Sequence, residues 1–408
     1  MNSKSFIPFL VLFCLVFNSC SIIKTNRLVK KSKLQNEVFY VEIPFTYNSN
    51  QIFVPVEIEG KPYNFIFDTG ADLSIIDQEI LKSISYEKQF SRNVFDASNS
   101  KSKLDFISIP KIAISELEFT NIIAVSADLK HFEKRISCPR IDGVIGIDLI
   151  RKSNWKIDYK NNLLCATNSF NKIKNTEQPT AALLKTGKNG AIITKLESGD
   201  KKINMKLDTG FSGGLLIDKH KSQLAYNNYP NNQKTFTIAE TGTTLNEKKM
   251  TKSRVDFIKL DQIKLQNSIL TNQIVTLSNH KNLIGNSFLE NYQVLMNFSN
   301  DEIILKGAPK EIEMIKENFE IILAPNYKNT RIEIIGFMDG ANNLDLFKSE
   351  KLEIISINNK DVTKFSKDEL CEYWLNDSNP YFRENEISLK VKNGEIFSEI
   401  KLARKTYL

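Results

Sequence analysis

The sequence predicts a mainly β protein of two similar lobes, followed by a small α+β module at its C-terminal end. Asp-Thr-Gly occurs twice, at Asp68-Thr69-Gly70 and at Asp208-Thr209-Gly210. An apolar pair followed by glycine also occurs twice, at Val144-Ile145-Gly146 and at Leu283-Ile284-Gly285. The aspartates are 140 positions apart and the motif-ending glycines are 139 apart. Two motifs that repeat in one order at one offset indicate a duplicated unit, and each copy presents one carboxylate.

The length and composition agree with a globular protein of several domains, except at the N-terminal end. The chain has 408 residues, of which 41% are hydrophobic and 25% charged, and a single core rarely grows to this size. Residues 1–20 differ from the rest. Lys4 precedes an apolar run, Phe6–Phe17, that is broken only by Pro8 and is too short to cross a membrane. We expect a secretory signal peptide here.

The end of this signal carries a cysteine and no Ala-x-Ala cleavage site. Asn18-Ser19-Cys20 resembles the lipobox of bacterial lipoproteins, in which the cysteine is acylated and becomes the mature N-terminus. Asn18 departs from the small or aliphatic residue that is usual there. The resemblance implies that Cys20 is lipidated and that the chain is extracytoplasmic, held at a membrane on the periplasmic or cell-surface side. An ordinary cleaved signal with a fortuitous cysteine is the alternative.

The formal charge of +7 does not indicate a nucleic-acid binder, because most of it lies in one short stretch. Six basic residues precede the first acid, Glu37, and leave only +1 for the rest of the chain. We therefore predict that residues 21–36 form a basic polar tether. Such a tether favours an anionic membrane surface, although a solvated leader explains the same charges.

Residues 37–172 form the first predicted lobe and residues 173–307 the second. In each lobe, short runs of β-branched and aromatic residues lead into Asp-Thr-Gly. A short helix and a hairpin are expected after each apolar-Gly motif, with the hairpins covering Asn154–Ala166 and Tyr292–Leu305. Strands at such short spacing predict two β-rich lobes.

The repeated motif contains residue types that suit a catalytic turn. Glycine allows the backbone to turn sharply and to approach the carboxylate, and the threonine hydroxyl can bind across to the partner loop. One Asp-Thr-Gly alone is a weak signal, because turns are rich in these residues. Two copies in matching contexts point to two carboxylates that meet between the lobes.

These segments resemble the aspartic peptidases of the pepsin and retropepsin type. Phe65–Ile76 is similar to the retropepsin-like active-site loop, and Asp142–Gly146 and Asn282–Gly285 are similar to the apolar-Gly loop that supports it. The resemblance covers residues 37–307. It implies a β-rich bilobal fold with a central cleft, in which Asp68 and Asp208 are the catalytic pair.

The resemblance also implies which residues support the two loops and which cover the cleft. The expected supporting residues are Thr69, Gly70, Ser74, Gly146, Thr209, Gly210 and Gly285. The second loop departs from the pattern, because Gly214 stands where the first has Ser74. By position, the candidate flaps are Asp96-Ala97-Ser98 and Ala239-Glu240-Thr241-Gly242, and plain hairpin turns are the alternative.

Two carboxylates at hydrogen-bond distance share a proton, so that one acts as general base on a water molecule and the other as general acid. The expected activity is therefore hydrolysis of a peptide or protein substrate by Asp68 and Asp208. This chemistry requires no cofactor, and the three histidines lie too far apart in sequence to indicate a metal site. One alternative is a peptide-binding or scaffolding lipoprotein that keeps the same cleft and cleaves nothing. Another is a peptidase that acts only on its own chain, for processing.

Residues 320–408 resemble a divergent PDZ domain. Ile334–Ala341 and Lys351–Val362 carry the resemblance, and a capping-box pattern predicts a helix over Lys367–Leu375. Domains of this family bind a chain end or an extended peptide by strand addition. The carboxylate-binding glycine loop is not visible, and Glu350-Lys351 replaces the usual Gly-Asp. A structural cap is the alternative to a peptide-binding domain.

Three of the five cysteines follow the signal peptide and the lipobox. Cys138 and Cys165 are the only candidates for a local disulfide within one lobe, and an extracytoplasmic setting permits one. An odd third cysteine argues against a disulfide framework. For Cys371 we expect a buried thiol on a helix.

Overall fold

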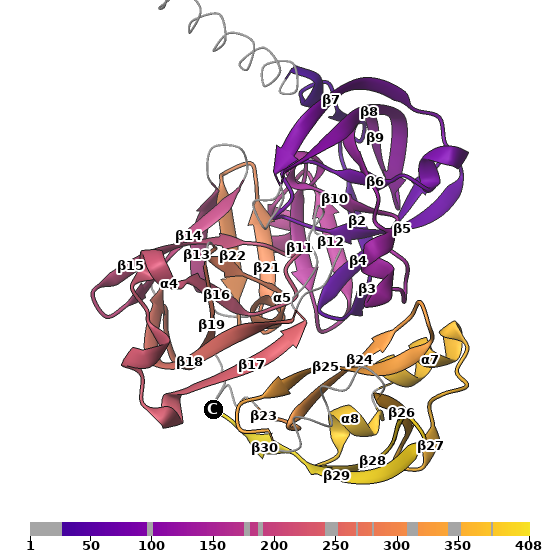
Figure 1. Ribbon diagram of the computed structural model, residues 1–408. Coiled ribbons are helices and arrows are strands. Elements are labelled where there is room, and N and C mark those ends of the chain that lie inside the picture. The colour runs from indigo at the N-terminus through magenta and orange to yellow at the C-terminus, as the bar shows by residue number, and fades with distance from the viewer. Residues whose placement is uncertain are drawn as a thin grey trace, which may run out of the picture.

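A computed structural model describes residues 27–95, 101–174, 180–186, 191–240, 252–266, 268–279, 281–307, 317–341, 352–376 and 378–408. The structure is mainly β, which confirms the predicted fold class. Figure 1 shows two lobes next to each other and a further unit packed against them. None of the helices in these ranges is long and apolar enough to span a membrane. The expected signal peptide, Cys20 and residues 21–26 lie outside the described residues.

Lobe 1 is built on a nine-stranded sheet in the order β1-β9-β6-β10-β5-β4-β8-β7, with β3 paired to β4. These strands are β1 (Lys33–Leu34), β3 (Thr46–Asn48), β4 (Gln51–Ile58), β5 (Lys61–Phe67), β6 (Ile75–Asp77), β7 (Glu87–Phe95), β8 (Lys101–Ile114), β9 (Leu117–Ala127) and β10 (Gly143–Ile145). The interior is aliphatic and aromatic, with Phe65, Phe67 and Phe119 fully buried.

Lobe 2 belongs to a fifteen-stranded sheet in the order β2-β12-β11-β21-β22-β13-β14-β15-β20-β16-β19-β18-β17-β25-β24. Its strands are β13 (Thr180–Thr186), β14 (Ile192–Ser198), β15 (Lys201–Leu207), β16 (Leu215–Asp218), β17 (Lys234–Glu240), β18 (Lys252–Leu265), β19 (Ser268–Ser278), β20 (Leu283–Ile284), β21 (Gln293–Asn297) and β22 (Glu302–Lys306). Lobe 1 adds β2 (Tyr40–Pro44), β11 (Asn154–Asp158) and β12 (Leu163–Thr167) to this sheet.

The two lobes share one strand topology, as the repeated motifs predict. In lobe 1, β10 pairs parallel to β5 and antiparallel to β6, and β6 pairs parallel to β9. In lobe 2, β20, β15, β16 and β19 repeat these pairings. The predicted hairpins also form, as β11–β12 and β21–β22, and β11 pairs with β21 to join the lobes through one continuous sheet.

The second half of the expected tether is attached to lobe 1. Strand β1 pairs antiparallel with β9, and Lys152 donates to the carbonyl of Ser32 at 2.6 Å. Leu28 and Val29 pack against a small cluster around Phe106. These apolar residues, which lie between the basic ones, explain why residues 27–36 pack onto the lobe and do not extend as a free tether.

The C-terminal unit (residues 317–408) has a core of its own. Its elements are β23 (Glu317–Asn318), β24 (Ile321–Asn326), β25 (Arg331–Met338), β26 (Leu352–Ile357), β27 (Lys360–Asp361), α7 (Lys367–Leu375), α8 (Pro380–Arg383), β28 (Glu386–Asn393), β29 (Ile396–Ala403) and β30 (Lys405–Thr406). The predicted helix α7 begins with a complete capping box, because Ser366 and Glu369 each accept from the other's backbone N–H.

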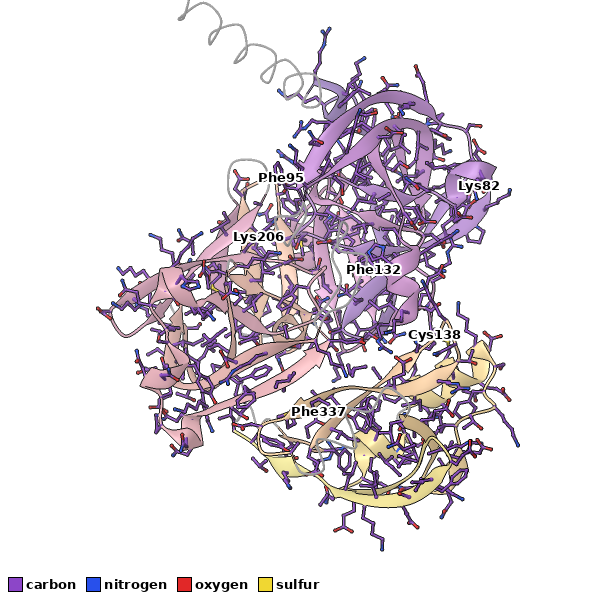
Figure 2. All side chains as sticks on the ribbon, viewed as in Figure 1. Lys82, Phe95, Phe132, Cys138, Lys206 and Phe337 are labelled. Carbon is purple, nitrogen blue, oxygen red and sulfur yellow. A yellow bond between two sulfur atoms is a disulfide. The ribbon has the colours of Figure 1, made fainter. Side chains whose placement is uncertain are left out.

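A strand pairing and a disulfide are among the contacts that join the C-terminal unit to the lobes. Strand β25 pairs antiparallel with β17 of lobe 2, with Ile238 opposite Phe337. A disulfide joins Cys138 of lobe 1 to Cys371 of α7, and Cys165 is a buried free thiol. The candidate Cys138–Cys165 pair does not form, and the expectation of a thiol at Cys371 is wrong, although this residue does lie on a helix. The partners are 233 positions apart in sequence, and only the packing of the C-terminal unit against lobe 1 brings them together. Figure 2 labels Cys138 on the side of lobe 1 that faces this unit.

Candidate active site

Each motif aspartate follows the last residue of a strand that pairs with the apolar-Gly segment of its own lobe. Asp68 follows β5, and its N–H donates to the Ile145 carbonyl of β10 at 3.0 Å. Asp208 follows β15, and its N–H donates to the Ile284 carbonyl of β20 at 2.9 Å. The two repeated motifs therefore form one structural unit in each lobe, and the apolar-Gly segment holds the end of the aspartate's strand.

The two threonines lock the loops together across the lobe interface. Thr69 N–H donates to Thr209 Oγ1 at 3.0 Å, and Thr209 N–H donates to Thr69 Oγ1 at 3.1 Å. Each hydroxyl also donates to the strand of the opposite lobe: Thr69 to the Leu207 carbonyl at 3.1 Å and Thr209 to the Phe67 carbonyl at 2.7 Å. Both threonines are fully buried. Buried polar groups that are all paired make this contact specific as well as stabilising.

The glycines of the motifs allow the carboxylates to approach the opposite loop. A Cβ on Gly70 would overlap the carboxylate of Asp208, and a Cβ on Gly210 would overlap that of Asp68. The same glycines donate N–H groups to the aspartates of their own loops, Gly70 to Asp68 at 2.6 Å and Gly210 to Asp208 at 3.0 Å. Each carboxylate is thus enclosed by both loops.

The two carboxyls repel each other when both are ionised, so ionisation of one disfavours ionisation of the other. Both aspartates are half-buried, so solvent reaches a pair that is otherwise surrounded by protein. Burial, and next the charge of Asp208, raise the pKa of Asp68. Burial also raises the pKa of Asp208, against the nearby Lys206 ammonium, which lowers it. Because the charge of one carboxyl acts on the other, the two groups titrate as a pair.

The residues that support the loops differ between the lobes, as the exchange of Ser74 for Gly214 indicates. In lobe 1, the Ser74 hydroxyl accepts from Gly146 N–H at 3.1 Å and donates to Asp148 at 2.9 Å. In lobe 2, Gly285 N–H donates to the Gly214 carbonyl at 2.9 Å. The ring of Phe211 packs where a Cβ on Gly285 would lie. Packing and a backbone bond thus replace a buried hydroxyl–carboxylate pair.

Three polar side chains that the sequence did not single out also bind the loops. Lys206 donates to the Gly70 carbonyl at 2.6 Å, and Gln51 donates to the Gly210 carbonyl at 2.9 Å. Asn286 donates to the Thr209 carbonyl at 2.7 Å and accepts from Tyr159 at 2.8 Å. Comparison of the two copies of the motif would have found Lys206, because a cation there replaces Ile66 in an otherwise apolar strand end.

The candidate flaps lie at the ends of equivalent hairpins, β7–β8 and β17–β18. Asp96, Ala97 and Ser98, together with Thr241 and Gly242, fall outside the described residues. Ala239 is buried and Glu240 ends β17. Both line a cavity of about 490 Å³ that also touches Phe211, whose N–H donates to the Asp208 carbonyl at 3.1 Å. The base of the second candidate flap therefore lies beside the aspartate loop of lobe 2.

Glu240 also connects the two lobes and the C-terminal unit. Arg135 of lobe 1 contacts Glu240 at 2.7 Å and Glu333 of β25 at 2.8 Å, and it donates to the Pro325 carbonyl at 2.7 Å. Lys134 also bridges the two glutamates. The end of β17 is therefore held by charges from lobe 1 and by strand pairing from the C-terminal unit.

Comparison with known families agrees with this geometry. Residues 54–149 match the family model of aspartyl proteases. The match covers the Asp68 loop and the apolar-Gly segment of lobe 1, and it supports a peptidase activity for the chain. No curated protein matches the sequence.

Proposed function

We propose that the chain is an aspartic endopeptidase, in which Asp68 and Asp208 activate a water molecule that attacks a peptide bond. The observation that carries the proposal is the reciprocal enclosure of the two carboxylates, in which each motif glycine packs against the aspartate of the other lobe. Two neighbouring carboxyls that protein largely surrounds are costly to keep in a fold. A site that only binds peptides has no need of such a pair.

The shared proton provides both halves of acid–base catalysis. The ionised carboxylate takes a proton from the water as the water attacks the carbonyl carbon, and the protonated carboxyl donates to the carbonyl oxygen. The tetrahedral intermediate then collapses as its C–N bond breaks and a proton passes to the leaving amine. The products are a carboxylic acid and an amine, and the aspartates return to one shared proton.

The cavity of about 490 Å³ beside the lobe 2 loop is a candidate pocket for a substrate side chain. Its lining combines apolar residues with charges of both signs: Phe211, Leu216, Ala239, Val255, Leu277, Lys219, Arg254, Glu240 and Asp256. We propose that the pocket accepts a side chain next to the scissile bond. Because Glu240 lines it, the ion pairs of Arg135 also position one wall.

We further propose that the protein is an extracytoplasmic lipoprotein, anchored to a membrane by lipid on Cys20. The Cys138–Cys371 disulfide supports this location, since disulfides persist in oxidising compartments outside the cytoplasm. If Cys20 carries the lipid, residues 27–36 determine which lobe lies nearer the anchor. Residues 27–36 are docked on lobe 1, so the lobe lies close to the anchor.

For the C-terminal unit, the contacts favour the structural alternative over peptide binding. Among the described residues, β24 ends its sheet, but its Leu323 N–H already donates to the hydroxyl of Tyr381 at 3.1 Å. Tyr381 is buried on α8. A peptide that adds to this edge would have to displace that side chain. We propose that the unit acts as a brace for β17 and lobe 1.

The peptidase proposal is tested by cleavage of a mixed peptide library by the lipid-free chain from Ser21 onward, between acidic and neutral pH. The expected result is cleavage that falls by at least about a thousandfold in both Asp68→Asn and Asp208→Asn, because either change removes half of the acid–base pair. The cut sites would reveal the substrate preference.

An exposed carboxylate away from the site provides the matched control. The side chain of Asp200 is 85% exposed on the turn before β15, and Asp200→Asn should retain most of the activity. Absence of cleavage at every pH, with peptides still retained by the protein, would contradict the proposal and favour the peptide-binding lipoprotein.

A further inference from the structure

A lysine of lobe 2 reaches into the aspartate loop of lobe 1. Lys206 lies two residues before Asp208, near the end of β15, and its Nζ donates to the Gly70 carbonyl at 2.6 Å. The side chain is 30% exposed, and Asp72 lies 3.9 Å from its Nζ. Figure 2 labels Lys206 in the region where the two lobes meet.

The residue that Lys206 binds is the one that packs against the Asp208 carboxylate. A Cβ on Gly70 would overlap Asp208, and Lys206 donates to the carbonyl of this same glycine. The ammonium is therefore one of the groups near Asp208. Lys206 also lies on β15, the strand that leads into Asp208.

The equivalent position of the other loop has a neutral donor. The Gly210 carbonyl accepts from the amide of Gln51 at 2.9 Å. In strand position, Lys206 corresponds to Ile66, which is buried. The two loops therefore match in hydrogen bonding but differ in charge, because the donor to the Gly70 carbonyl is a cation and the donor to the Gly210 carbonyl is a neutral amide.

The charged groups around the pair come from each packed element. On β15 there is Lys206, and just before β20 there is Lys281; both lower the pKa of Asp208 against the effect of burial, Lys206 more strongly. From lobe 1 the group that faces the site is Asp72, which is exposed and contacts Lys206. The charge that acts most strongly on Asp68 is that of Asp208 itself, and it raises the pKa of Asp68.

We infer that Lys206 is a positioning residue that holds the negative charge of the pair on Asp208 and leaves the proton on Asp68. The inference rests on the proposed peptidase function. It assigns the two chemical roles: Asp208 accepts the proton of the attacking water, and Asp68 donates to the carbonyl oxygen. It also predicts that the enzyme stays active at lower pH than it would without the cation.

Three substitutions separate the charge of Lys206 from its hydrogen bond. Lys206→Met removes both and keeps the length of the side chain. Lys206→Gln keeps a donor for the Gly70 carbonyl and removes the charge, as Gln51 does at the other loop. Lys206→Arg keeps both, and it is expected to restore the wild-type profile.

The first measurement is kcat/KM against pH for a peptide that the wild-type chain cleaves. An opposite charge close to a carboxyl lowers its pKa by about one unit or more, so Lys206→Met and Lys206→Gln should each move the acidic limb up by about one pH unit. Lys206→Arg should leave it in place. If the limb stays in place in Lys206→Met and Lys206→Gln, and only its height changes, the lysine has a structural role alone and the inference is overturned.

A second measurement needs no turnover. Carboxyl carbons of ¹³C-labelled aspartate are titrated by NMR, and the two signals are assigned from Asp68→Asn and Asp208→Asn. The inference expects Asp208 to ionise at lower pH than Asp68 and expects the gap to narrow in Lys206→Met. The reverse order, or a gap that the substitution does not change, overturns it. If the expected order is found in a chain that cleaves no peptide, the inference about charge stands while the proposed function fails.

Discussion

Lobe 1 and lobe 2 share their strand topology but differ in the connections that lead away from it. Between the strands that precede and form the apolar-Gly segment, lobe 1 has residues 128–142, whereas lobe 2 has only residues 279–282. The longer connection contains Lys134, Arg135 and Cys138, which contact the C-terminal unit. Both lobes therefore have the same core around their aspartates, and lobe 1 has the longer segment that contacts the C-terminal unit.

The hairpins β7–β8 and β17–β18 also differ between the lobes, and here it is lobe 2 that has the additional contact with the C-terminal unit. Among the described strands, β7 is at the end of its sheet, whereas the equivalent β17 pairs with β25 of the C-terminal unit. Figure 1 shows β25 next to β17 on the side of lobe 2 that faces this unit. An unpaired edge can move or take up another strand more easily than a paired one. In the described part of the chain, the first hairpin therefore has an unpaired edge at β7, whereas the second is braced by β25.

The largest expected effect tests a feature that the two lobes share, the packing of each motif glycine against the carboxylate of the other lobe. Gly70→Ala and Gly210→Ala should each lower kcat/KM by at least about a hundredfold, because each Cβ would displace the carboxylate of the opposite lobe. Gly214→Ala is the control, since its Cβ would meet only the hydroxyl of Ser287, at 3.1 Å. Peptide cleavage measures the loss. A large loss in only one of the two variants would show that the loops are not equivalent.

The next effect tests a feature of lobe 1, its disulfide to the C-terminal unit. Loss of the Cys138–Cys371 disulfide, in Cys138→Ser with Cys371→Ser or by reductant, should lower the free energy of unfolding by about 2–4 kcal/mol, since the cross-link restricts the unfolded chain. Urea denaturation with and without reductant measures it. Cys165→Ala is the control, because this buried thiol is free and its variant should still respond to reductant. Equal stability in both conditions would contradict the link.

The smallest effect concerns a buried acid that lobe 2 lacks. Burial raises the pKa of Asp148 to about 7, from 3.8, against its hydrogen bond with Ser74. Stability is therefore full below about pH 4 and falls as the pH rises through about 7. Asp148→Asn stays neutral, so at pH 8 it should be more stable than wild type by on the order of 1–3 kcal/mol. At pH 4 the two proteins should be equal.

Urea denaturation at the two pH values measures this difference. Asp200→Asn is the control, because the side chain of Asp200 is 85% exposed and should change stability little at either pH. In lobe 2 the equivalent position is Ser287, which has no charge to bury. A variant that is less stable than wild type at pH 8 would mean that Asp148 is ionised and needed as an anion.

Local patterns were sufficient to predict the duplicated β-rich core. The offsets of Asp-Thr-Gly and the apolar-Gly motif identified both aspartates, and the runs at Asn154–Ala166 and Tyr292–Leu305 predicted the two hairpins. The capping box of α7 was equally local. What these patterns did not contain is that β11 pairs with β21, since two similar hairpins offer many registers and only the packing of both lobes selects one.

The disulfide and the Lys206 contact were not predicted from the sequence, and the reason is the same for both. Sequence proximity suggested Cys138 and Cys165, but the disulfide joins residues 233 positions apart. Lys206 was not singled out in the sequence, and its side chain reaches a carbonyl 136 positions away. Neither contact leaves a periodic pattern in the sequence, because each depends on one side chain and one distant neighbour.

The sequence by itself determined that two copies of one β unit each present an aspartate on a glycine turn. That information is local, since turn chemistry and strand alternation act over a few residues. Only the tertiary structure decided how the copies differ. The cation beside Asp208, the brace on β17 and the disulfide from lobe 1 all arise where distant segments meet, and their energies depend on burial and distance that no local pattern encodes.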